Sequence, residues 1–178
     1  VAEYGLPLMV KPADEGSSVG MTKVTQLDQL QPAYEEAKQY NCAVFAEQWV
    51  TGTEYTISIV GDRVLPIIRV ETDSVFYDYE AKYQSDETRY FCPCGLDAEA
   101  ERAMQQLAKV AFETLGASGW GRIDLMQDDE GQAWLIELNT VPGMTDHSLV
   151  PMAAKATGRG FDVLVGEILL DALERGRG

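Results

Sequence analysis

Short apolar runs and alternating positions mark the strands expected in the first part of the chain. Residues 8–11 read as a short buried strand that ends at Pro12, and residues 43–49 form an apolar, strand-like run. Residues 54–60 and 63–70 alternate on either side of Gly61-Asp62, which suits a tight hairpin turn. A period of two is that of a strand with one buried face. We therefore expect two separate strands and one hairpin here.

Other stretches follow the longer period of a helix. Residues 25–40 have apolar positions near this period, although Pro32 disturbs the pattern. Residues 97–115 predict the clearest helix, because Asp97 suits the N-cap and acidic residues fill the first turn. Two shorter helices are expected at residues 150–156 and 161–174.

Residues 76–88 are polar and aromatic without a period, which predicts a long loop of the kind that often carries function. Strands and helices are mixed along the chain, and the strands come as hairpins. This organisation predicts an α+β fold, in which helices pack on an antiparallel sheet.

A further hairpin near the carboxyl end carries a group of polar side chains. Residues 128–131 read Asp-Asp-Glu-Gly and lie between two apolar runs, as a turn does. Side chains alternate across a strand, so Arg122 and Asp124 share one face of the first strand, and Glu137 and Asn139 share one face of the second. The hairpin should therefore gather all four on one patch.

The turn also predicts a register for this hairpin. If Gln127 lies opposite Gln132, then Arg122 falls opposite Glu137, and Asp124 falls opposite Leu135. The other face is then covered by Ile123, Trp134, Ile136 and Leu138.

The chemistry of this group indicates a magnesium site. Two carboxylates and an amide oxygen are hard ligands that suit Mg²⁺, and a neighbouring guanidinium suits a phosphate or a developing oxyanion. The alternative is an ordinary Arg–Glu pair on a solvent-facing surface. Residues 139–143, Asn-Thr-Val-Pro-Gly, turn the chain and bring backbone amides close to the group.

Composition excludes several classes of function. The chain has 178 residues, 46 % of them hydrophobic, so it can bury a core. Lys and Arg number 14 against 29 Asp and Glu, and the formal net charge of −15 disfavours nucleic-acid binding. No apolar run reaches the length of a membrane span, and no signal peptide is visible. We therefore expect a cytoplasmic protein without membrane contact.

The cysteines and the histidine suggest no metal or disulfide framework. Cys42, Cys92 and Cys94 are few and irregularly spaced, which favours reduced, structural thiols. Half of a soft-metal site at Cys92 and Cys94 is the alternative. The single His147 cannot form a zinc site by itself.

Candidate ligand contacts also lie around the first strands. Lys11 closes a strand beside the Gly-Ser-Ser-Val-Gly loop of residues 16–20 and can hold a phosphate, unless it is a plain surface lysine. The wall that can hold a purine is formed by Glu47, Gln48, Trp49 and Val50. Glu54 can then reach ribose hydroxyls; the alternative is a capped strand end with a core tryptophan.

The expected loop and the hairpin add further candidates. Phe76, Lys82 and Tyr83 lie in the loop and can fold over a ligand, unless the loop packs on its own domain. Met126 shares the face of Asp124 and can pack beneath a flat ring, although methionine is also a common core filler.

In this order, these motifs closely resemble the D-alanine–D-alanine ligase family of the ATP-grasp superfamily. The resemblance covers essentially the whole chain. Besides Glu47 and Glu54 it rests on Lys-Pro at 11–12, Glu-Gly-Ser-Ser-Val-Gly-Met at 15–21, Tyr-Asp-Tyr-Glu-Ala-Lys-Tyr at 77–83, Gly-Trp-Gly-Arg-Ile-Asp at 119–124, Glu-Leu-Asn-Thr-Val-Pro-Gly-Met-Thr at 137–145 and His-Ser-Leu-Val-Pro at 147–151.

The resemblance implies an ATP site clamped between two α+β layers. Residues 1–50 would be part of the central ATP-grasp subdomain, and residues 51–178 the carboxyl-terminal ATP-grasp domain with the Mg/ATP and second-substrate site. The implied enzyme joins two D-alanines into D-alanyl-D-alanine through an acyl phosphate, with ATP giving ADP and phosphate. The product serves peptidoglycan synthesis, and through it cell-wall biogenesis and cell shape.

The resemblance also implies roles for single residues. Asp124 and Glu137 would hold one Mg²⁺, and Glu137 with Asn139 a second, with Mn²⁺ as an alternative ion. Arg122 and the backbone N–H of Gly143 would stabilise the acyl-phosphate and tetrahedral oxygens. Alignment of the first D-alanine would fall to Ser17 and Tyr83, and binding of the second carboxylate to Lys82, Ser148 and Leu149. The phosphates of the nucleotide would contact Lys11, its adenine would contact Glu47 to Val50, and its ribose would contact Glu54. Further contacts with the nucleotide would come from Phe76, Lys82 and Met126.

Two rival functions stay open. A D-alanine–D-lactate ligase or another ATP-grasp ligase would share the hairpin and use a different acceptor, although Tyr83 resembles the dipeptide-forming members. A non-catalytic nucleotide-binding module is the rival from another class.

The chain reads as a fragment of a longer protein, because Val1 is not an initiator methionine and runs straight into a core strand. The amino-terminal domain of the family and an earlier phosphate-binding lysine would then be missing. We expect such a fragment to bind ATP poorly and not to turn over alone. The full-length protein is expected to be a homodimer.

Overall fold

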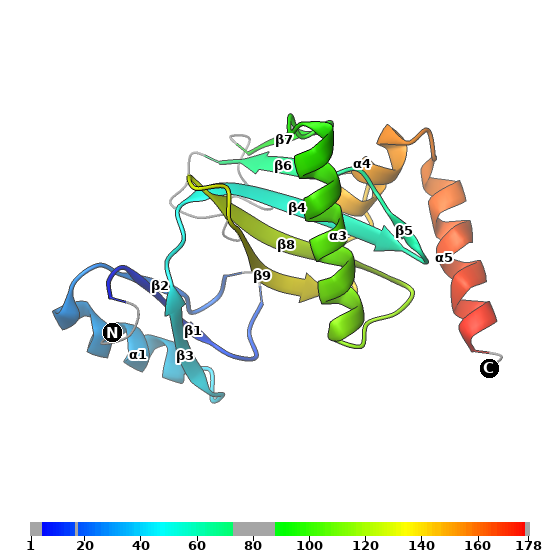
Figure 1. Ribbon diagram of the computed structural model, residues 1–178. Coiled ribbons are helices and arrows are strands. Elements are labelled where there is room, and N and C mark those ends of the chain that lie inside the picture. Colours follow the sequence, from blue (N-terminus) through cyan, green and yellow to red (C-terminus); the bar gives the residue numbers. More distant parts are fainter. Residues whose placement is uncertain (1–4, 17, 73–87, 177–178) are drawn as a thin grey trace. The chain divides into compact units, whose positions relative to one another are not determined.

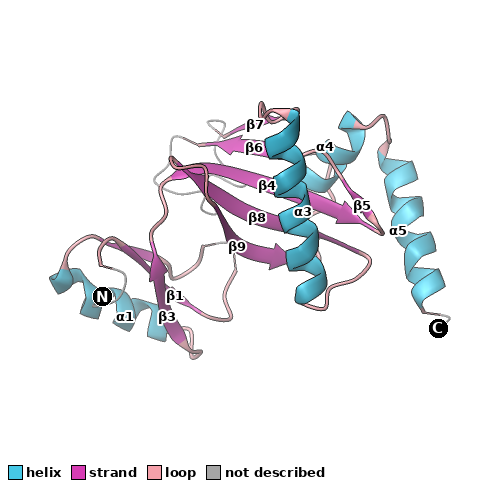
Figure 2. Ribbon diagram, in the orientation of Figure 1, coloured by secondary structure: helices cyan, strands magenta, loops and turns pink. Residues whose placement is uncertain are grey.

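The structure, a computed structural model, describes residues 5–16, 18–72 and 88–176. Its residues group into two compact units: the first takes in the chain up to Val50, and the second takes in Thr51–Glu71 and the chain from Arg89 onward. Each unit combines strands with helices (Figures 1 and 2).

The first unit is a small antiparallel sheet with one helix. Its strands are β1 (Leu8–Pro12), β2 (Thr22–Val24) and β3 (Val44–Gln48), in the order β2-β1-β3. A 3₁₀ turn, η1 (Leu27–Gln29), leads into α1 (Leu30–Lys38). Its core is formed by Val10, Val24, Ala33 and Ala37.

The helix expected at residues 25–40 is shorter in the structure. Only Leu30–Lys38 is α-helical, and Pro32 is the third residue of α1. A proline is tolerated in the first turn, because the N–H that it lacks has no partner within the helix. Pro32 therefore lies near the start of the helix instead of interrupting it.

The second unit is built on one antiparallel sheet. Its path runs β7-β6-β4-β8-β9, and β5 pairs with β4. The strands are β4 (Gly52–Val60), β5 (Arg63–Val64), β6 (Ile68–Glu71), β7 (Arg89–Phe91), β8 (Trp120–Asp128) and β9 (Ala133–Asn139).

The hairpin around Gly61-Asp62 is confirmed, but its second arm is divided. Val64 pairs with Ile59 as expected, and the chain then leaves the sheet. It returns as β6, which pairs with the other end of β4, Val70 lying opposite Glu54. Pro66 in the gap has no N–H to give to a ladder, which accounts for the interruption.

Helix α3 (Ala98–Thr114) packs across one face of this sheet (Figure 1). Asp97 caps it as expected, its side chain accepting hydrogen bonds from the N–H groups of Glu99 and Ala100. The core beneath α3 joins helix residues such as Met104 and Phe112 to strand residues that share one face of β4 and β8. This face is therefore closed by α3.

The opposite face of the sheet is covered in part by α4 (Leu149–Ala156), and α5 (Phe161–Arg175) contributes Leu164 to the same core. Both helices were predicted from the sequence, at residues 150–156 and 161–174. Val60 and Trp120 pack against α4, and they lie on the face opposite α3. The polar hairpin residues Arg122 and Asp124 share this second face with them, because they are separated from Trp120 by even steps.

The α+β prediction, with helices on antiparallel sheets, is confirmed. Among the described helices, none combines the length and the apolar character needed to cross a bilayer.

Candidate active site

The β8–β9 hairpin carries the polar group in a different register from the one predicted. Asp124 lies opposite Glu137, and Arg122 lies opposite Asn139. Nearer the turn, Gln127 lies opposite Ala133, and not opposite Gln132 as the sequence suggested. The predicted pairing was therefore wrong, although all four polar residues do share one face.

The turn explains the difference in register. Asp128 donates its N–H to the carbonyl of Gln132 (3.0 Å), so the loop has one residue fewer than expected. Gly131 has φ of +81°, a left-handed conformation that a three-residue hairpin loop needs. The Asp128 carboxylate also accepts hydrogen bonds from the N–H groups of Glu130 (3.1 Å) and Gln132 (2.8 Å).

A β-bulge then changes the phase of β9. Leu125 lies opposite Leu135, whereas Asp124 lies opposite Glu137, so Ile136 is the extra residue. In a regular ladder without the bulge, Ile136 would lie opposite Asp124, and Glu137 would face α3. The bulge thus turns Glu137 and Asn139 toward Asp124.

Two apolar assignments are corrected by the same register. Trp134 lies opposite Met126 and so shares the face of Asp124, whereas it was predicted on the apolar face. Its indole Nε1 donates a hydrogen bond to Asp128 Oδ2 (2.7 Å), which lowers the pKa of that carboxyl. Leu135 was predicted opposite Asp124 and lies instead opposite the core residue Leu125.

Asp124 is the centre of the group, and among the described residues each of its carboxylate oxygens accepts two hydrogen bonds. Oδ1 accepts from Thr56 Oγ1 (2.7 Å) and Arg122 Nε (2.8 Å). Oδ2 accepts from Arg122 Nη2 (2.7 Å) and Asn139 Nδ2 (3.1 Å). Asp124 is only 4 % exposed. A buried carboxylate is tolerated when it is paired and hydrogen-bonded in this way.

Arg122 contacts Asp124 of its own strand, two residues away, through both arms of its guanidinium. An ordinary cross-strand Arg–Glu pair was the alternative to a functional group. The structure does not have this arrangement, because Arg122 lies opposite Asn139. The guanidinium fork matches a carboxylate, and it suits a phosphate equally well.

The donor set of the hairpin fits a hard divalent cation. Asn139 Nδ2 donates to Glu137 Oε1 (3.2 Å) as well as to Asp124, so the amide joins the two carboxylates. Glu137 is exposed and Asn139 is half-buried, so they stand at the outer side of the group. Within the described ranges, no three His, Cys, Asp or Glu side chains form a metal-binding cluster; this set has two carboxylates and one amide.

Thr56 is the residue that the sequence analysis missed. It is 2 % exposed, lies opposite Asp124 on β4, and donates to it. The signal in the sequence was its position two residues after Glu54, on the same face of one strand. The pairing of β4 with β8 was needed before that signal had a meaning.

Glu54 and Met126 continue the same face toward the turn of the hairpin. They are directly opposite one another on β4 and β8, and both are half-buried. The structure therefore lines up Glu54, Met126, Thr56 and Asp124 on one face of the sheet.

Gly143 and Ser148 form a neighbouring group in the segment between β9 and α4. Ser148 Oγ accepts a hydrogen bond from the Thr145 N–H (2.9 Å), and Ser148 directly precedes α4, where Leu149 is buried. A Cβ at Gly143 would lie 2.9 Å from Ser148 Oγ. A side chain at position 143 would therefore displace the Ser148 hydroxyl from its place in this segment.

The first unit holds Lys11 and Glu47 together. Lys11 Nζ lies 2.6 Å from Glu47 Oε1, and the lysine side chain is 15 % exposed. Lys11 is thus not a plain surface lysine. Trp49 is half-buried beneath the ammonium of Lys23, which lies 3.8 Å from the ring centre, and Gln48 is exposed, while Val50 is half-buried.

Four predicted site residues, Ser17, Phe76, Lys82 and Tyr83, lie outside the residues that the structure describes, as does most of the expected loop at 76–88.

The cysteines carry no sign of reactivity. All three are free, and burial raises the pKa of the Cys92 and Cys94 thiols. A raised pKa keeps a thiol protonated and poorly nucleophilic. Reduced, structural thiols stay a prediction.

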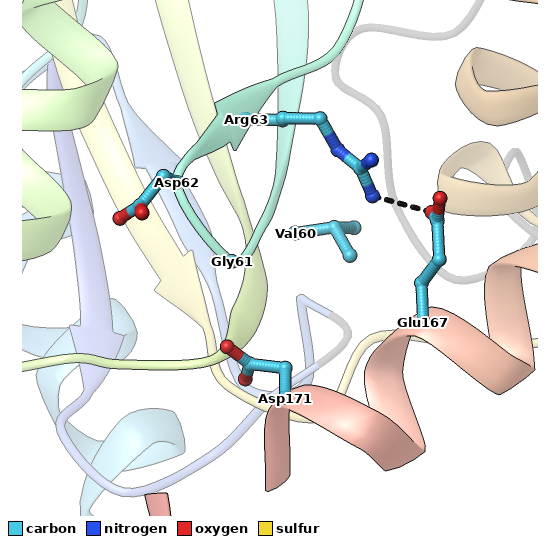
Figure 3. A pocket seen from close by; sticks show the side chains of 6 residues that line it. All are labelled: Val60, Gly61, Asp62, Arg63, Glu167 and Asp171. Atoms are coloured by element: carbon cyan, nitrogen blue, oxygen red, sulfur yellow. Dashed lines mark hydrogen bonds and ion pairs between the residues drawn. The ribbon is translucent and has the colours of Figure 1, made fainter. Parts of the chain in front are cut away.

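A separate pocket lies away from the hairpin group, between the β4–β5 turn and α5 (Figure 3). Arg63 points toward Glu167 and pairs with it, and Asp171 lies beside Gly61 and pairs with Arg175 (2.8 Å). The Arg63 and Arg159 guanidinium groups lower the pKa of Glu167. The Arg63–Glu167 pair holds α5 on the turn, whereas the Asp171–Arg175 pair lies within α5. The candidate chemistry is not here.

Comparison with known proteins gives matches that cover nearly the whole chain. Residues 1–170 match the family described as "D-ala D-ala ligase C-terminus". The D-alanine–D-alanine ligase of Alcanivorax borkumensis is 61 % identical over 177 residues, which are 99 % of this chain and 58 % of that protein. The chain therefore spans little more than half the length of this curated relative.

Solved structures of similar fold include ligases with different second substrates. The D-alanine–D-alanine ligase of Bacillus anthracis, solved in complex with ATP, has a TM-score of 0.84 and 28 % identity over 99 % of this chain and 56 % of its own. The D-Ala:D-Ser ligase of Enterococcus faecalis has a TM-score of 0.84 and 33 % identity over 94 % of this chain and 50 % of its own.

Proposed function

The chain belongs to the D-ala D-ala ligase C-terminus family, and from this membership we propose that the protein joins two D-alanines into D-alanyl-D-alanine at the expense of ATP. The observation that carries the proposal is the group around Asp124, in which a bidentate guanidinium, a second carboxylate and an amide share one face of the β8–β9 hairpin. A chemistry that moves negatively charged phosphate needs both cationic and anionic groups of this kind.

Asp124, Glu137 and Asn139 would hold Mg²⁺ or Mn²⁺, with Glu137 shared between two ions. Their oxygens are the hard ligands that these ions prefer. The ions would neutralise phosphate charge during transfer.

The reaction has two steps in this proposal. The carboxylate of the first D-alanine attacks the γ-phosphorus of ATP. An acyl phosphate forms on D-alanine, and ADP is the leaving group. The amine of the second D-alanine then attacks the acyl carbon, and phosphate leaves as the C–N bond forms and the amine loses a proton. Arg122 and the N–H of Gly143 would stabilise the oxygens that gain charge.

The start of α4 suits the carboxylate of the second substrate. Ser148 lies at the N-cap and Leu149 at the first helical position, where backbone N–H groups and the helix dipole favour an anion. We assign Ser148 and Leu149, with Lys82, to that carboxylate, and Ser17 and Tyr83 to the first D-alanine.

Nucleotide contacts are assigned within each unit. In the first unit, Lys11 would contact phosphate, and Glu47, Gln48, Trp49 and Val50 would contact adenine; the ion pair with Glu47 supports Lys11, because it holds the ammonium in place. In the second unit, Glu54 would contact ribose, and Met126, beside it on the sheet, the nucleotide. Phe76 and Lys82 complete the assignment. The two units would be part of the central ATP-grasp subdomain and the carboxyl-terminal ATP-grasp domain.

A ligase with a different acceptor is the second candidate. The Enterococcus faecalis structure favours it, since a D-Ala:D-Ser ligase matches this chain with the same TM-score as the ATP complex of the Bacillus anthracis ligase. D-lactate is a further acceptor to be tested. The homodimer and the cytoplasmic location stay predictions.

Phosphate release from ATP by the complete natural protein tests the proposal. We expect phosphate release that requires D-alanine. At a low concentration of D-alanine, adding more D-alanine should raise the release far more than adding D-serine or D-lactate. D-alanine-independent ATP hydrolysis, or none, would contradict the ligase function, and a clear gain with D-serine or D-lactate would reassign the acceptor.

Glu137→Gln tests the metal ligands in the same protein. The change removes one anionic ligand at an exposed position, so we expect kcat to fall by orders of magnitude while Tm stays within a few degrees. Gln132→Glu near the turn, which leaves the group untouched, is the control. Near-parental turnover of Glu137→Gln at millimolar Mg²⁺ would contradict the assignment.

A further inference from the structure

Arg122 donates to both oxygens of Asp124, and each oxygen has a different second donor. Thr56 and Arg122 Nε hold Oδ1, at 2.7 and 2.8 Å, and Thr56 is 2 % exposed. Asn139 holds Oδ2 in addition to Arg122, and its hydrogen bond of 3.1 Å is the longest of the four. Oδ1 is therefore fixed from the interior of the sheet, and Oδ2 lies on the side of Glu137 and Asn139.

We propose that Thr56 is a positioning residue that keeps Oδ1 of Asp124 turned into the sheet, so that Oδ2 is the oxygen presented to a divalent cation. This inference rests on the proposed function only in taking Asp124, Glu137 and Asn139 as cation ligands.

Asn139 provides the reason why Oδ2 becomes available. Its Nδ2 now donates to both carboxylates, so its amide nitrogen faces the group. An amide binds a cation through its oxygen, and the amide must therefore turn round before Asn139 can act as a ligand. That turn removes one donor from Oδ2 and leaves both donors of Oδ1 in place.

The hydroxyl of Thr56 is well suited to this task. The torsion that rotates a carboxylate is broad, so Asp124 needs neighbours to hold one orientation. Threonine has a restricted χ1 because it is branched at Cβ, and Thr56 lies in the middle of β4, directly opposite Asp124. Its hydroxyl is thus a fixed donor on a central strand.

Mn²⁺ binding to the complete natural protein tests the inference without depending on turnover. Thr56→Val keeps the shape and removes the hydroxyl, and Thr56→Ser keeps the hydroxyl. Ser58→Ala is the matched control, because Ser58 is a buried hydroxyl residue one step along the same face of β4. The Mn²⁺ dissociation constant is measured by electron paramagnetic resonance, with and without ATP, and Tm is measured beside it.

Loss of a residue that orients a metal ligand typically weakens metal binding by about 10–100-fold. We expect this weakening for Thr56→Val and parental affinity for Thr56→Ser and Ser58→Ala. The Mg²⁺ concentration for half-maximal phosphate release should rise in Thr56→Val, and kcat at saturating Mg²⁺ should change less. If Thr56→Val does not fold, Thr56→Ala takes its place with the same expectation.

Several results would overturn the inference. Parental Mn²⁺ affinity in a folded Thr56→Val or Thr56→Ala protein would do so, as would equal weakening in Thr56→Ser or Ser58→Ala, or a parent protein that does not bind Mn²⁺. A parent without D-alanine-dependent phosphate release whose Mn²⁺ binding still depends on the Thr56 hydroxyl would contradict the proposed function and support the inference. A parent with D-alanine-dependent phosphate release, together with unchanged Mn²⁺ binding in Thr56→Val, would support the proposed function and contradict the inference.

Discussion

Asp124 and Arg122 form a buried ion pair whose charges satisfy one another. Arg122 is 13 % and Asp124 5 % exposed at the side chain, and two parallel hydrogen bonds join them. Removal of one partner would leave the other charge buried and unpaired, which is strongly destabilising. A conservative substitution is therefore needed to separate catalysis from stability.

Arg122→Lys keeps the positive charge and loses the fork. Lysine cannot make both hydrogen bonds to Asp124, so we expect Tm to fall by a few degrees. If Arg122 also stabilises a developing oxyanion, kcat should fall by about 10²–10³-fold, while the ATP dissociation constant changes much less.

Arg63→Lys is the control for this variant. Arg63 also pairs with a carboxylate, Glu167, in the second unit, but it lies in the separate pocket. We expect its kcat to match the parent. An Arg122→Lys protein with a lowered Tm and kcat within twofold of the parent would make Arg122 a purely structural partner of Asp124.

At the scale of residues, the sequence predicted which polar side chains share a face and not which ones lie opposite. The alternation of Arg122 with Asp124 is local, and so it could be read directly. The positions of Trp134 and Leu135 depended on a loop one residue shorter than expected and on the left-handed conformation of Gly131. Both choices are made by the turn and cannot be deduced from the period of the strands.

At the scale of elements, α3 shows how a local signal sets a boundary. Asp97 accepts hydrogen bonds from the N–H groups of Glu99 and Ala100, both at 2.9 Å. These hydrogen bonds hold the pKa of the Asp97 carboxyl below its usual range. A depressed pKa in the folded state means that the cap contributes stability at neutral pH and loses it as the pH falls through that lowered pKa.

Asp97→Ala should lower Tm by about 2–4 °C at pH 7, as loss of an N-cap does in a domain of this size. The difference from the parent should be complete above about pH 4, the ordinary pKa of an aspartate. It should shrink as the pH falls below that value toward the lowered pKa of the folded carboxyl. Asp97→Asn keeps a neutral hydrogen-bond acceptor. Its Tm should lie between those of the parent and Asp97→Ala, and the stability that its cap contributes should depend little on pH. Thermal unfolding across this pH range measures Tm for the parent and both variants. A Tm difference between the parent and Asp97→Ala that grows as the pH falls would contradict the role of Asp97 as a charged N-cap.

The longer helices could be predicted because their caps and periods are local. The strands β2 and β7 were not predicted, since three residues are too few to display a period. The division of the second arm of the Gly61-Asp62 hairpin into two strands was also not predicted, because residues 63–70 keep their alternation across the break.

At the scale of the whole molecule, the formal net charge of −15 is the dominant long-range term. Such an excess of one sign opposes compaction through self-repulsion, and exposed ion pairs offset it weakly. We expect Tm of the metal-free protein to rise when NaCl is increased from about 0.01 to about 0.3 M, as the screening length shortens.

Tetramethylammonium chloride is the matched control for this rise, because it screens equally well and its cation is a poor ligand. Equal rises in both salts indicate general repulsion, and a rise only in NaCl would indicate cation binding. A Tm that falls in both salts would mean that attractive pairs outweigh the excess of negative charge.

The arrangement of the sheet was the least predictable feature. Strand β4 lies between β6 and β8, and the hydrogen bond from Thr56 to Asp124 joins residues 68 positions apart. No local period contains that pairing. The hairpin could be predicted from the sequence, and the interior donor that supports it could not.

The bulge at Ile136 has a consequence for how relatives of this chain should be aligned. On either side of it the ladder is regular, so a chain lacking this one residue would still place Leu135 opposite Leu125 and Glu137 opposite Asp124. A gap at this position is thus compatible with an intact pair of carboxylates, whereas a gap after Glu137 would separate Asn139 from its neighbours. A search pattern for the site should accordingly allow one residue of variation between the aspartate and the glutamate, and none between the glutamate and the asparagine.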